Sequence, residues 1–566
     1  MTKLKRYMDV MPEPLAEAKF AVESRQLERA AEILADKAEK TVSQIFEADP
    51  TRTDLVFEIA ELLLQTKNVE QAENWYKKIL AKGPDAAAYN KLGRLCEYMG
   101  RLWEAVTYQR KALEVQPDRG ELFANLGRLL ICTGEVKEGV TFLQRAAEKL
   151  PQNAQIHSIL LFHLHQLSTF EPERLFAEHK KWGQTFAPLK RAKTSHSNDR
   201  NPDRRLRVGY ISPDFRRTSV AYFFESLLDG HDGQVVETYG YGNVEFPDSV
   251  TERLQGKFNC YHNIYGIDDK QVVELIESDE IDILVDLAGH TGNNRLLVMS
   301  YKPAPIQVTW LGYPDTTGVE AIDYRLTDVL ADPAKLQKYY TEKLVCLPDG
   351  FLCYRPADFA SAVAPLPAEK NGFITFGSFN NNCKMNKVVI GLWAKILKET
   401  QNSRLLLKFK GGNDEQIRQR YHQQFRELGI EKEKVLIYGW GRPDEHLKLY
   451  DHVDIALDTY PYNGTTTTCE ALWMGVPVVS LVGQYHASRV GLSILSRVGL
   501  EFFAASNPEE YVSKTIALAS NIQSLAQIRT SMRARIANSG LCYAKGFARN
   551  LEAAYRKMWH RWTETE

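Results

Sequence analysis

The segment IALDTYPYNGTTTTCEALWMGVPVVSLVG (455–483) has the pattern of a strand, a loop, a helix and a second strand. Its two ends, IALDTYP and VPVVSLVG, are short and apolar, whereas TCEALWMG between them is typical of a helix. Two apolar strands joined through a helix predict neighbouring parallel strands that are buried on both faces. This part of the chain is therefore expected to have an α/β fold.

The same alternation of strands and helices continues on both sides of this segment. Strands are predicted in two series, at 205–212, 235–242, 281–289, 305–314 and 322–328, and then at 373–380, 403–410, 435–440, 455–461 and 476–483. Two successive series predict two Rossmann-like lobes, which we place at 206–365 and 366–566. Ligands of such folds bind beyond the carboxyl ends of the strands, so the crevice between the lobes is the expected site.

The first part of the chain, 1–167, has a different period, which is set by prolines. Four of them follow one another at steps of 34, 33 and 34 residues, at Pro50, Pro84, Pro117 and Pro151. The last three each close a helical run: KKILAKGP, QRKALEVQP and QRAAEKLP. This period is typical of tetratricopeptide repeats, which are helix pairs of about 34 residues. Three repeats are clear over 51–151, a degenerate or capping pair is predicted at 15–50, and residues 152–167 begin a further helix.

The repeats have two interpretations. Gly100 and Gly134 fall between the helices of a pair, where a helix end needs a positive φ, and Asn90 and Asn125 lie on first helices. Stacked repeats predict a concave surface for a peptide or partner protein, and these asparagines lie near it, where they are placed to hold a peptide backbone or are only solvated. Alternatively, the helices only stack and support the rest of the chain. The polar and basic stretch 168–205 that follows is predicted to be a linker.

Composition argues against several classes of protein. The chain has 566 residues, 44% of them hydrophobic and 25% charged, with a net charge of −1, which is ordinary for a globular protein of several domains. This balance predicts no nucleic-acid partner, and the lack of a long apolar run predicts no membrane span. The N-terminus lacks the apolar run of a secretory signal, and the eight cysteines form no C-x-x-C pair. We therefore expect a cytoplasmic protein without a disulfide framework.

A run of threonines at a predicted helix start has the features of an anion site. Asn463, Gly464 and the threonines 465–468 place free backbone N–H groups and hydroxyls at the positive end of the helix dipole. Glu470, one turn later, is placed to accept hydrogen bonds from ribose hydroxyls. The alternative is a simple threonine cap with a solvated glutamate.

A second loop, FGSFNNNCKMNK (376–387), also follows a predicted strand. Lys384 in this loop is placed to neutralise a diphosphate as a compact cation, and Asn381 is placed to hydrogen-bond the same ligand. The alternative is a lysine whose charge is only solvated at the surface.

The first lobe contributes the loops SPDFRRTSVAYFF (212–224), DLAGHTGNNR (286–295) and WLGYPDTTG (310–318). His290 is a candidate acid or base because the pKa of histidine lies near neutrality, or else it has a structural role. The sequence contains no GxGxxG, no P-loop, no Asp-x-Asp and no His/Cys metal spacing. We therefore expect neither a resident cofactor nor a metal.

A resemblance to a known family rests on six segments: RVGYISPDF, DILVDLAGHT, KPAPIQVTWLGYP, FNNNCKMNK, EHLKLYDHVDIALDTYPYNGTTT and ALWMGVPVVSLVG…ASRVG. Together they resemble the catalytic region of the protein O-GlcNAc transferases, including bacterial and SPINDLY-like members, over residues 206–500. The likeness implies a GT-B glycosyltransferase, preceded by tetratricopeptide repeats, with a nucleotide sugar in the cleft and no metal. It also implies inverting transfer of N-acetylglucosamine from UDP-GlcNAc to Ser or Thr hydroxyls of an acceptor protein, which is bound through the repeats and the cleft.

The resemblance further implies roles for individual residues. Lys384 matches the family lysine that contacts the UDP phosphates, His446 the histidine that packs against uracil, and Glu470 an acidic residue on the ribose. The remaining matches are Thr465, Thr466 and Thr467 in the phosphate loop, Asn381 where the family often has Gln, Leu311, Gly312 and Tyr313 around the sugar, and His290 as a pocket histidine.

One position departs from the family pattern. After SPDFRR the family usually has a histidine that lines the active site, and here the residue is Thr218, which cannot transfer protons near neutral pH. The alternatives are therefore a repeat scaffold whose transferase region is catalytically weak, or a related transferase that uses GDP-fucose or UDP-glucose. The general base stays unassigned, with His290 or a chain of waters as candidates.

Overall fold

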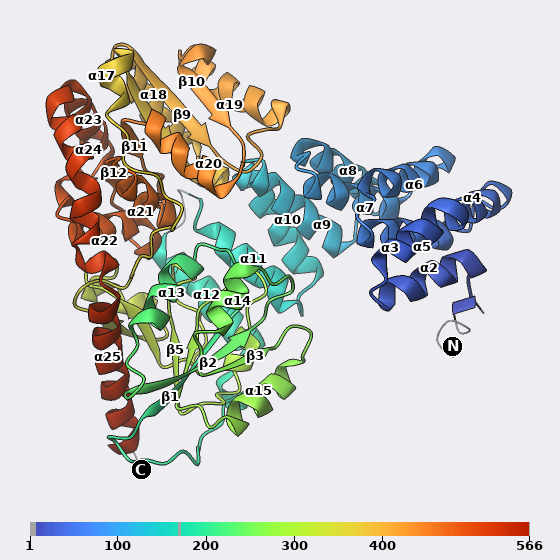
Figure 1. Cartoon of the computed structure of the whole chain (residues 1–566), viewed down its shortest axis with the longest axis horizontal. Coiled ribbons are helices and arrows are strands. Elements are labelled where there is room, and N and C mark those ends of the chain that lie inside the picture. The colour runs from blue at the N-terminus through green and yellow to red at the C-terminus, as the bar shows by residue number, and fades with distance from the viewer. Residues whose placement is uncertain (1–6, 9, 168–170, 565–566) are drawn as a thin grey trace. The chain divides into compact units, whose positions relative to one another are not determined.

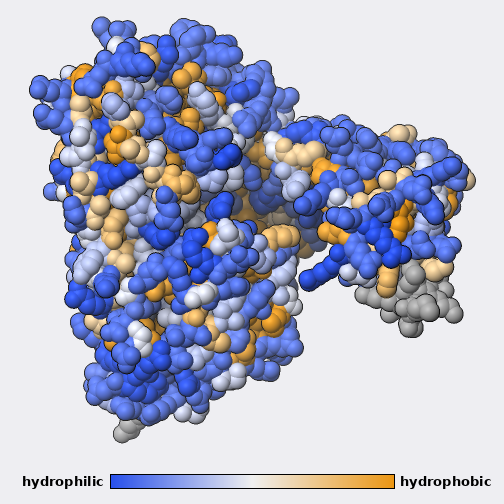
Figure 2. Space-filling model, viewed as in Figure 1, coloured by the Kyte–Doolittle hydropathy of each residue, from blue (hydrophilic) through white to orange (hydrophobic). Residues whose placement is uncertain are grey.

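The computed structural model of the chain describes residues 7–8, 10–167 and 171–564 (Figure 1). The chain divides into two compact units, which we call the repeat unit (1–133 and 141–150) and the α/β unit (134–140 and 151–566). Among the described residues, no helix combines the length and the apolar character needed to cross a bilayer. The face drawn in Figure 2 is mostly hydrophilic, with hydrophobic residues in small scattered groups.

The repeat unit consists of helices that pair as the proline period predicts. The helices are α2 (Glu13–Glu23), α3 (Leu27–Ile33), α4 (Glu39–Ala48), α5 (Thr53–Gln65), α6 (Val69–Lys82), α7 (Ala86–Tyr98), α8 (Leu102–Val115), α9 (Gly120–Cys132) and, from residue 141 on, α10 (Val136–Lys149), with a π-helical turn, η1 (Leu34–Ala38), between α3 and α4. All four prolines lie between pairs, and the predicted capping pair is formed by the helices before α5. The prediction of a helical repeat is therefore confirmed.

Small residues allow the helices of a pair to approach closely. Ala72 and Ala105 are fully buried, and Gly100 has the predicted positive φ, +77°.

The two asparagines of the predicted concave surface bond each other, because Asn125 Nδ2 donates to Asn90 Oδ1 over 3.0 Å. Each therefore already has a partner within the repeat unit.

The α/β unit contains two sheets whose strands are all parallel. The first sheet has the order β3-β2-β1-β4-β5-β6-β7, and the second has the order β10-β9-β8-β11-β12-β13. The strands are β1 (Leu206–Ser212), β2 (Val236–Gly242), β3 (Cys260–Asn263), β4 (Ile283–Asp286), β5 (Ile306–Thr309), β6 (Tyr324–Thr327), β7 (Lys343–Cys346), β8 (Ile374–Ser378), β9 (Ser403–Lys408), β10 (Val435–Tyr438), β11 (Ile455–Leu457), β12 (Val478–Leu481) and β13 (Ala504–Ala505). Two successive Rossmann-like lobes, as predicted, result from this topology.

Helices connect and cover these strands. They are α11 (Ala154–Leu164), α12 (Pro172–Phe186), α13 (Ala221–Gly230), α14 (Ser249–Gln255), α15 (Asp269–Ser278), α16 (Leu296–Met299), α17 (Pro367–Asn371), α18 (Lys387–Glu399), α19 (Glu415–Glu427), α20 (Pro443–Lys448), α21 (Thr466–Trp473), α22 (Val490–Arg497), α23 (Pro508–Ser520), α24 (Ile522–Ala537) and α25 (Ala544–Glu564). Most of the second lobe lies within 366–566, but α25 returns to the first lobe, where Phe547 stacks on Trp310 with ring centroids 5.7 Å apart.

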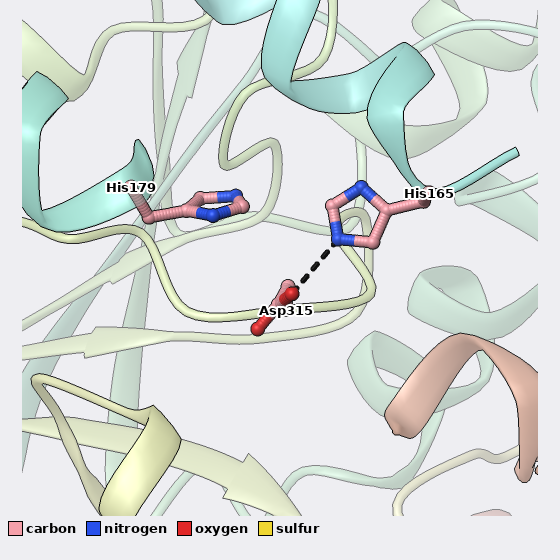
Figure 3. A group of neighbouring side chains, drawn as sticks. All are labelled: His165, His179 and Asp315. Atoms are coloured by element: carbon pink, nitrogen blue, oxygen red, sulfur yellow. Dashed lines mark hydrogen bonds and ion pairs between the residues drawn. The ribbon is translucent and has the colours of Figure 1, made fainter. Parts of the chain in front are cut away.

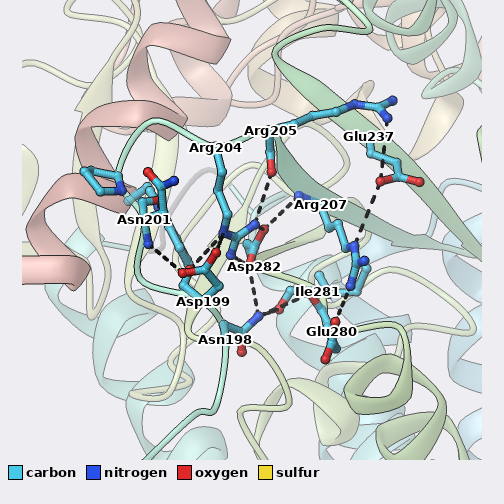
Figure 4. A network of polar contacts seen from close by, with 12 residues as sticks. Asn198, Asp199, Asn201, Arg204, Arg205, Arg207, Glu237, Glu280, Ile281 and Asp282 are labelled. Carbon is cyan, nitrogen blue, oxygen red and sulfur yellow. Dashed lines mark hydrogen bonds and ion pairs between the residues drawn. The ribbon is translucent and has the colours of Figure 1, made fainter.

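The range 168–205, which we expected as a linker, is largely folded against the first lobe; residues 168–170 lie outside the described part of the chain. Its first half forms α12, which contacts α11. Its second half is an extended strap held by one buried carboxylate. Asp282 accepts two hydrogen bonds from Arg204, at 2.5 and 2.7 Å, and one from Asn198 at 2.9 Å (Figure 4).

The contact between α12 and the first lobe depends on two glycines. A Cβ atom on Gly183 would lie 1.7 Å from the carbonyl oxygen of Gly318, and Gly318 itself has a positive φ of +71°. We expect Gly183→Ala to lower the free energy of unfolding by about 1–3 kcal/mol, the usual cost of overpacking. Gly391→Ala is the matched control, since nothing lies within 4 Å of its added Cβ in α18, and it should stabilise by about 0.5–1 kcal/mol. Urea denaturation measures both, and equal effects would contradict the contact.

Candidate functional site

A cleft of about 340 Å³ opens between the two lobes of the α/β unit. Segments that follow the carboxyl ends of strands in both sheets line it, which is where the topology predicts a ligand. The first lobe contributes Ser219, Val220, Phe223, Leu311, Gly312, Pro314, Phe351 and Leu352; the second contributes Phe379, Asn380, Asn381, Lys384, Phe409, Lys410, Trp440, Tyr462, Thr465, Thr466, Thr467, His486 and Val490. Its volume lies within the range of small-molecule sites.

The threonine run lies at the start of α21, as the sequence predicts. No side chain caps the first turn of this helix, so its leading N–H groups are available to an anion. The hydroxyl of Thr466 is buried and has no hydrogen-bond partner among the described residues, whereas the hydroxyl of Thr467 donates to Asn380 Oδ1 over 3.0 Å. This end of the cleft therefore presents unsatisfied donors.

Lys384 reaches the same end of the cleft from the short 3-10 helix η4 (Asn382–Lys384). Its Nζ donates to the carbonyl oxygen of Asn463 over 2.9 Å and lies 4.0 Å from the ring centroid of Tyr462. Burial lowers the pKa of this lysine, because a charged amine loses solvation there. Lys384 and the threonine run therefore converge on the same end of the cleft, and Asn381 lines the cleft beside them.

A buried aspartate supports the loop from behind. Asp458 Oδ1 accepts hydrogen bonds from the backbone N–H groups of Gly464 at 2.6 Å and Thr459 at 2.8 Å, and Oδ2 accepts one from the Ser480 hydroxyl at 2.6 Å. Burial raises the pKa of Asp458 to about 6, against the effect of these bonds. The carboxyl group therefore fixes the path of the chain between β11 and α21.

His446 and Glu470 bond each other beside the cleft. His446 Nε2 lies 3.0 Å from Glu470 Oε2, and its Nδ1 accepts from Lys408 Nζ over 2.7 Å. The ring of His446 also contacts Phe379, which lines the cleft. The two predicted nucleoside contacts, His446 and Glu470, are therefore brought together, but Phe379 lies between His446 and the cleft.

The predicted sugar loop divides between two environments. Leu311, whose φ is +74°, and Gly312 line the cleft. Tyr313 is buried and donates its hydroxyl proton to His179 Nε2 over 2.6 Å. Thr218 lies beside the cleft residues Ser219 and Val220, and its hydroxyl donates to the carbonyl oxygen of Asp214.

His290 lies away from the cleft, in a buried contact with α11 and α12. Its Nδ1 accepts from the Ser158 hydroxyl at 2.9 Å and its Nε2 donates to the Thr317 carbonyl at 2.8 Å. Burial, followed by the neighbouring His179, holds the pKa of His290 well below its ordinary value. Both nitrogens are occupied by structural bonds, so this geometry favours the structural role over proton transfer.

Three neighbours of His290 could offer ligand atoms to a metal. In the part of the chain that the structure describes, His165, His179 and Asp315 are the one group of this kind, with ligand atoms within 4.8 Å of one another (Figure 3). All three are already bonded: His165 Nε2 faces Asp315 Oδ2 at 2.8 Å, and each imidazole Nδ1 faces the carbonyl four residues earlier. The group therefore forms a complete hydrogen-bond network without an ion.

Buried histidine should make this network sensitive to acid. Burial lowers the pKa of His179 to about 4, whereas an unfolded histidine titrates near about 6.5. As pH falls from 7 to 4, the unfolded chain binds a proton that the folded chain does not, so stability falls by up to about 3 kcal/mol. His179→Gln lacks this effect, and its unfolding free energy relative to the unmodified chain should therefore rise as the pH falls. Urea denaturation at pH 4 to 7 measures the difference, and a constant difference would contradict a neutral His179.

Sequence reasoning missed three residues at this site. Asp458 lies inside the predicted strand 455–461, and the available signal was a carboxylate within an apolar run. Trp440, two-thirds exposed on the cleft wall, lies at the end of the predicted strand 435–440. His486 lies in the stretch between VPVVSLVG and ASRVG, which the resemblance did not include.

Comparison with known proteins finds relatives for both parts of the chain. The profile of glycosyl transferase family 41 matches residues 143–360 and 365–551, and two tetratricopeptide repeat profiles match 21–95 and 86–119. A mutant of Thermobaculum terrenum O-GlcNAc transferase has a solved structure that superposes with a TM-score of 0.85 and 32% identity, over 91% of this chain and 99% of that one.

The curated relatives are longer proteins. Arabidopsis thaliana probable UDP-N-acetylglucosamine–peptide N-acetylglucosaminyltransferase SPINDLY is 44% identical over 403 residues, which are 70% of this chain and 44% of the relative. The Caenorhabditis elegans UDP-N-acetylglucosamine–peptide N-acetylglucosaminyltransferase is 25% identical over 475 residues, 63% of this chain and 41% of the relative. The chain thus spans less than half the length of these relatives.

Proposed function

Since this chain belongs to glycosyl transferase family 41, we propose that it transfers a sugar, N-acetylglucosamine in the first instance, from UDP-GlcNAc to Ser or Thr hydroxyls of a protein or peptide. The single observation that carries the proposal is the convergence of Lys384 and the uncapped first turn of α21 in one interlobe cleft. A cation and free N–H groups at one point suit the pyrophosphate of a nucleotide sugar. The curated relatives carry the name of this activity.

The chain's own donors would stabilise the leaving group. As the sugar departs, negative charge grows on the β-phosphate, and Lys384 with the amides at Thr466 and Thr467 is placed to bind it. None of the described residues that line the cleft is an aspartate or a glutamate. The lining therefore offers hydrogen-bond donors to an anion, but no carboxylate ligands to a divalent cation. We therefore propose that transfer proceeds without a metal or another cofactor.

The same lining supports a proposal for the direction of attack. A retaining double displacement needs a nucleophile in the cleft that forms a covalent sugar intermediate, commonly a carboxylate. Since the described lining has no carboxylate, we propose a single displacement in which the acceptor hydroxyl attacks the anomeric carbon from the face opposite UDP and inverts it. The acceptor chain would reach the cleft with help from the repeat unit.

Calorimetry followed by a donor screen tests this function. We expect UDP and UDP-GlcNAc to bind, and mass spectrometry of lysate proteins incubated with the chain and the donor to detect added N-acetylhexosamine. Because Thr218 stands where the family usually has histidine, the second candidate function is a scaffold with a weak transferase region. Binding of UDP without hydrolysis or transfer would favour the scaffold, binding of GDP and GDP-fucose would reassign the donor, and no nucleotide binding would contradict the proposal.

A further inference from the structure

A histidine on the floor of the cleft has no part in the functions described so far. His486 begins the short helix η7 (His486–Ser488) in the loop after β12, and it lines the cleft although it is only 3% exposed. Its Nδ1 lies 2.7 Å from Asp332 Oδ2. Its Nε2 has no hydrogen-bond partner among the residues that the structure describes.

Asp332 fixes which nitrogen of His486 carries the proton. This carboxylate comes from the first lobe, is fully buried and also accepts hydrogen bonds from the hydroxyls of Tyr340, at 2.7 Å, and Thr327. Burial alone would raise the pKa of Asp332, but His486 and its other partners lower it to about 2. An ionised Asp332 accepts a hydrogen bond from the proton on Nδ1, and in the neutral imidazole a proton on Nδ1 leaves the lone pair on Nε2 free.

The position of His486 indicates what that lone pair meets. The backbone N–H of Asn463, in the proposed phosphate loop, donates to the carbonyl of Ala487 over 2.8 Å. The residue next to His486 is thus bonded to the loop that would hold the pyrophosphate, and the group bonded to that pyrophosphate is the sugar. Two apolar side chains of the cleft accompany His486, with the Phe351 ring centroid 4.9 Å away and Val490 in the same lining. An acceptor beside apolar side chains is suited to a sugar hydroxyl.

We propose that His486, oriented by Asp332, accepts a hydrogen bond through Nε2 from a hydroxyl of the donor sugar and so contributes to donor specificity. The proposal rests on the proposed function. It assigns Asp332 as a positioning residue, because the carboxylate acts only through the imidazole. Since the pair joins the two lobes, the alternative is a contact that only holds the cleft together.

Calorimetry with the bare nucleotide and the nucleotide sugar separates these alternatives. The pair used is UDP with UDP-GlcNAc, or GDP with GDP-fucose if the unmodified chain binds those instead. We expect His486→Phe to weaken binding of the nucleotide sugar about 10-fold, the size of one hydrogen bond, and to leave binding of the bare nucleotide unchanged. His486→Gln, whose amide oxygen can accept, should restore part of the affinity.

Asp332→Asn provides a second, independent variant. The amide can donate to Nδ1, which moves the imidazole proton to Nε2 and removes the acceptor while the histidine stays in place. We expect the same selective loss, with binding of the bare nucleotide as proof of an intact cleft. An equal loss for both ligands, or no loss for either, would overturn the sugar contact. Absence of nucleotide binding by the unmodified chain would instead overturn the proposed function, and the contact with it.

Discussion

The Lys384→Ala variant will turn over its donor at least about 10²-fold more slowly than the unmodified chain, which is the scale of losing one strong electrostatic stabiliser. The reason is the place of its amine, 2.9 Å from the Asn463 carbonyl at the head of the threonine run. Negative charge that develops on a leaving phosphate there needs a cation to stabilise it. Among the described cleft residues, the one other lysine or arginine is Lys410, which follows a different strand. Steady-state hydrolysis and transfer assays measure the loss.

Lys387→Ala is the matched control for this prediction. Lys387 is exposed and lies three residues further on, at the first position of α18. Its removal changes the net charge equally but leaves the cleft intact, so near-normal turnover is expected. Normal kinetics in Lys384→Ala would remove this residue from the mechanism. Equal losses in both variants would mean that net charge, rather than position, matters.

Asp458→Ala should both destabilise the α/β unit and abolish nucleotide binding. Truncation leaves the N–H groups of Gly464 and Thr459 and the Ser480 hydroxyl without their acceptor. A buried donor left unpaired costs about 1–3 kcal/mol, so a loss of about 3 kcal/mol or more in unfolding free energy is expected. Denaturation and calorimetry with UDP measure the two effects, and UDP binding of normal affinity would contradict the support that Asp458 gives the loop.

Asp458→Asn is the control, because the amide oxygen can still accept both N–H groups. Asp458 has a raised pKa of about 6, so the folded chain holds this proton more tightly than the unfolded chain. Its contribution to stability is therefore present at low pH and is lost as pH rises through about 4 to 6. Asparagine does not ionise, and the variant should gain stability relative to the unmodified chain over that interval. A fall in relative stability would contradict a neutral carboxyl group at low pH.

Periodicity predicted the central strands of both sheets and the edge strand β10, but not the other three edge strands. The strands that sequence reasoning missed, β3, β7 and β13, all lie at an edge of their sheet. Edge strands need no continuous apolar run, and β3 and β7 are indeed only partly buried. The helix α12 was missed for a related reason, since its polar residues face solvent and its partner α11 looked incomplete on its own.

Similarly, the sequence predicts those parts of the candidate site that depend on local patterns, but not those that depend on tertiary packing. The threonine run and Lys384 each follow a strand, so the rule for parallel sheets is enough to predict that they meet at one edge. Sequence could not reveal that His290 would be enclosed by Ser158, which lies 132 residues earlier. Nor could it reveal that His486 would find its carboxylate in the other lobe, 154 residues away. Such pairs depend on the packing of the lobes rather than on any local pattern.

Because α25 packs on the first lobe, the polypeptide passes between the lobes twice. One connection follows β7 and the other precedes α25, and the two are tied where the backbone N–H of Tyr354 donates to the carbonyl of Leu541 over 2.7 Å. Two paired connections constrain the lobes more than a single connection would. We therefore expect any opening of the cleft to be a rotation about the line of this pair, rather than a twist that carries Lys384 sideways past Leu311.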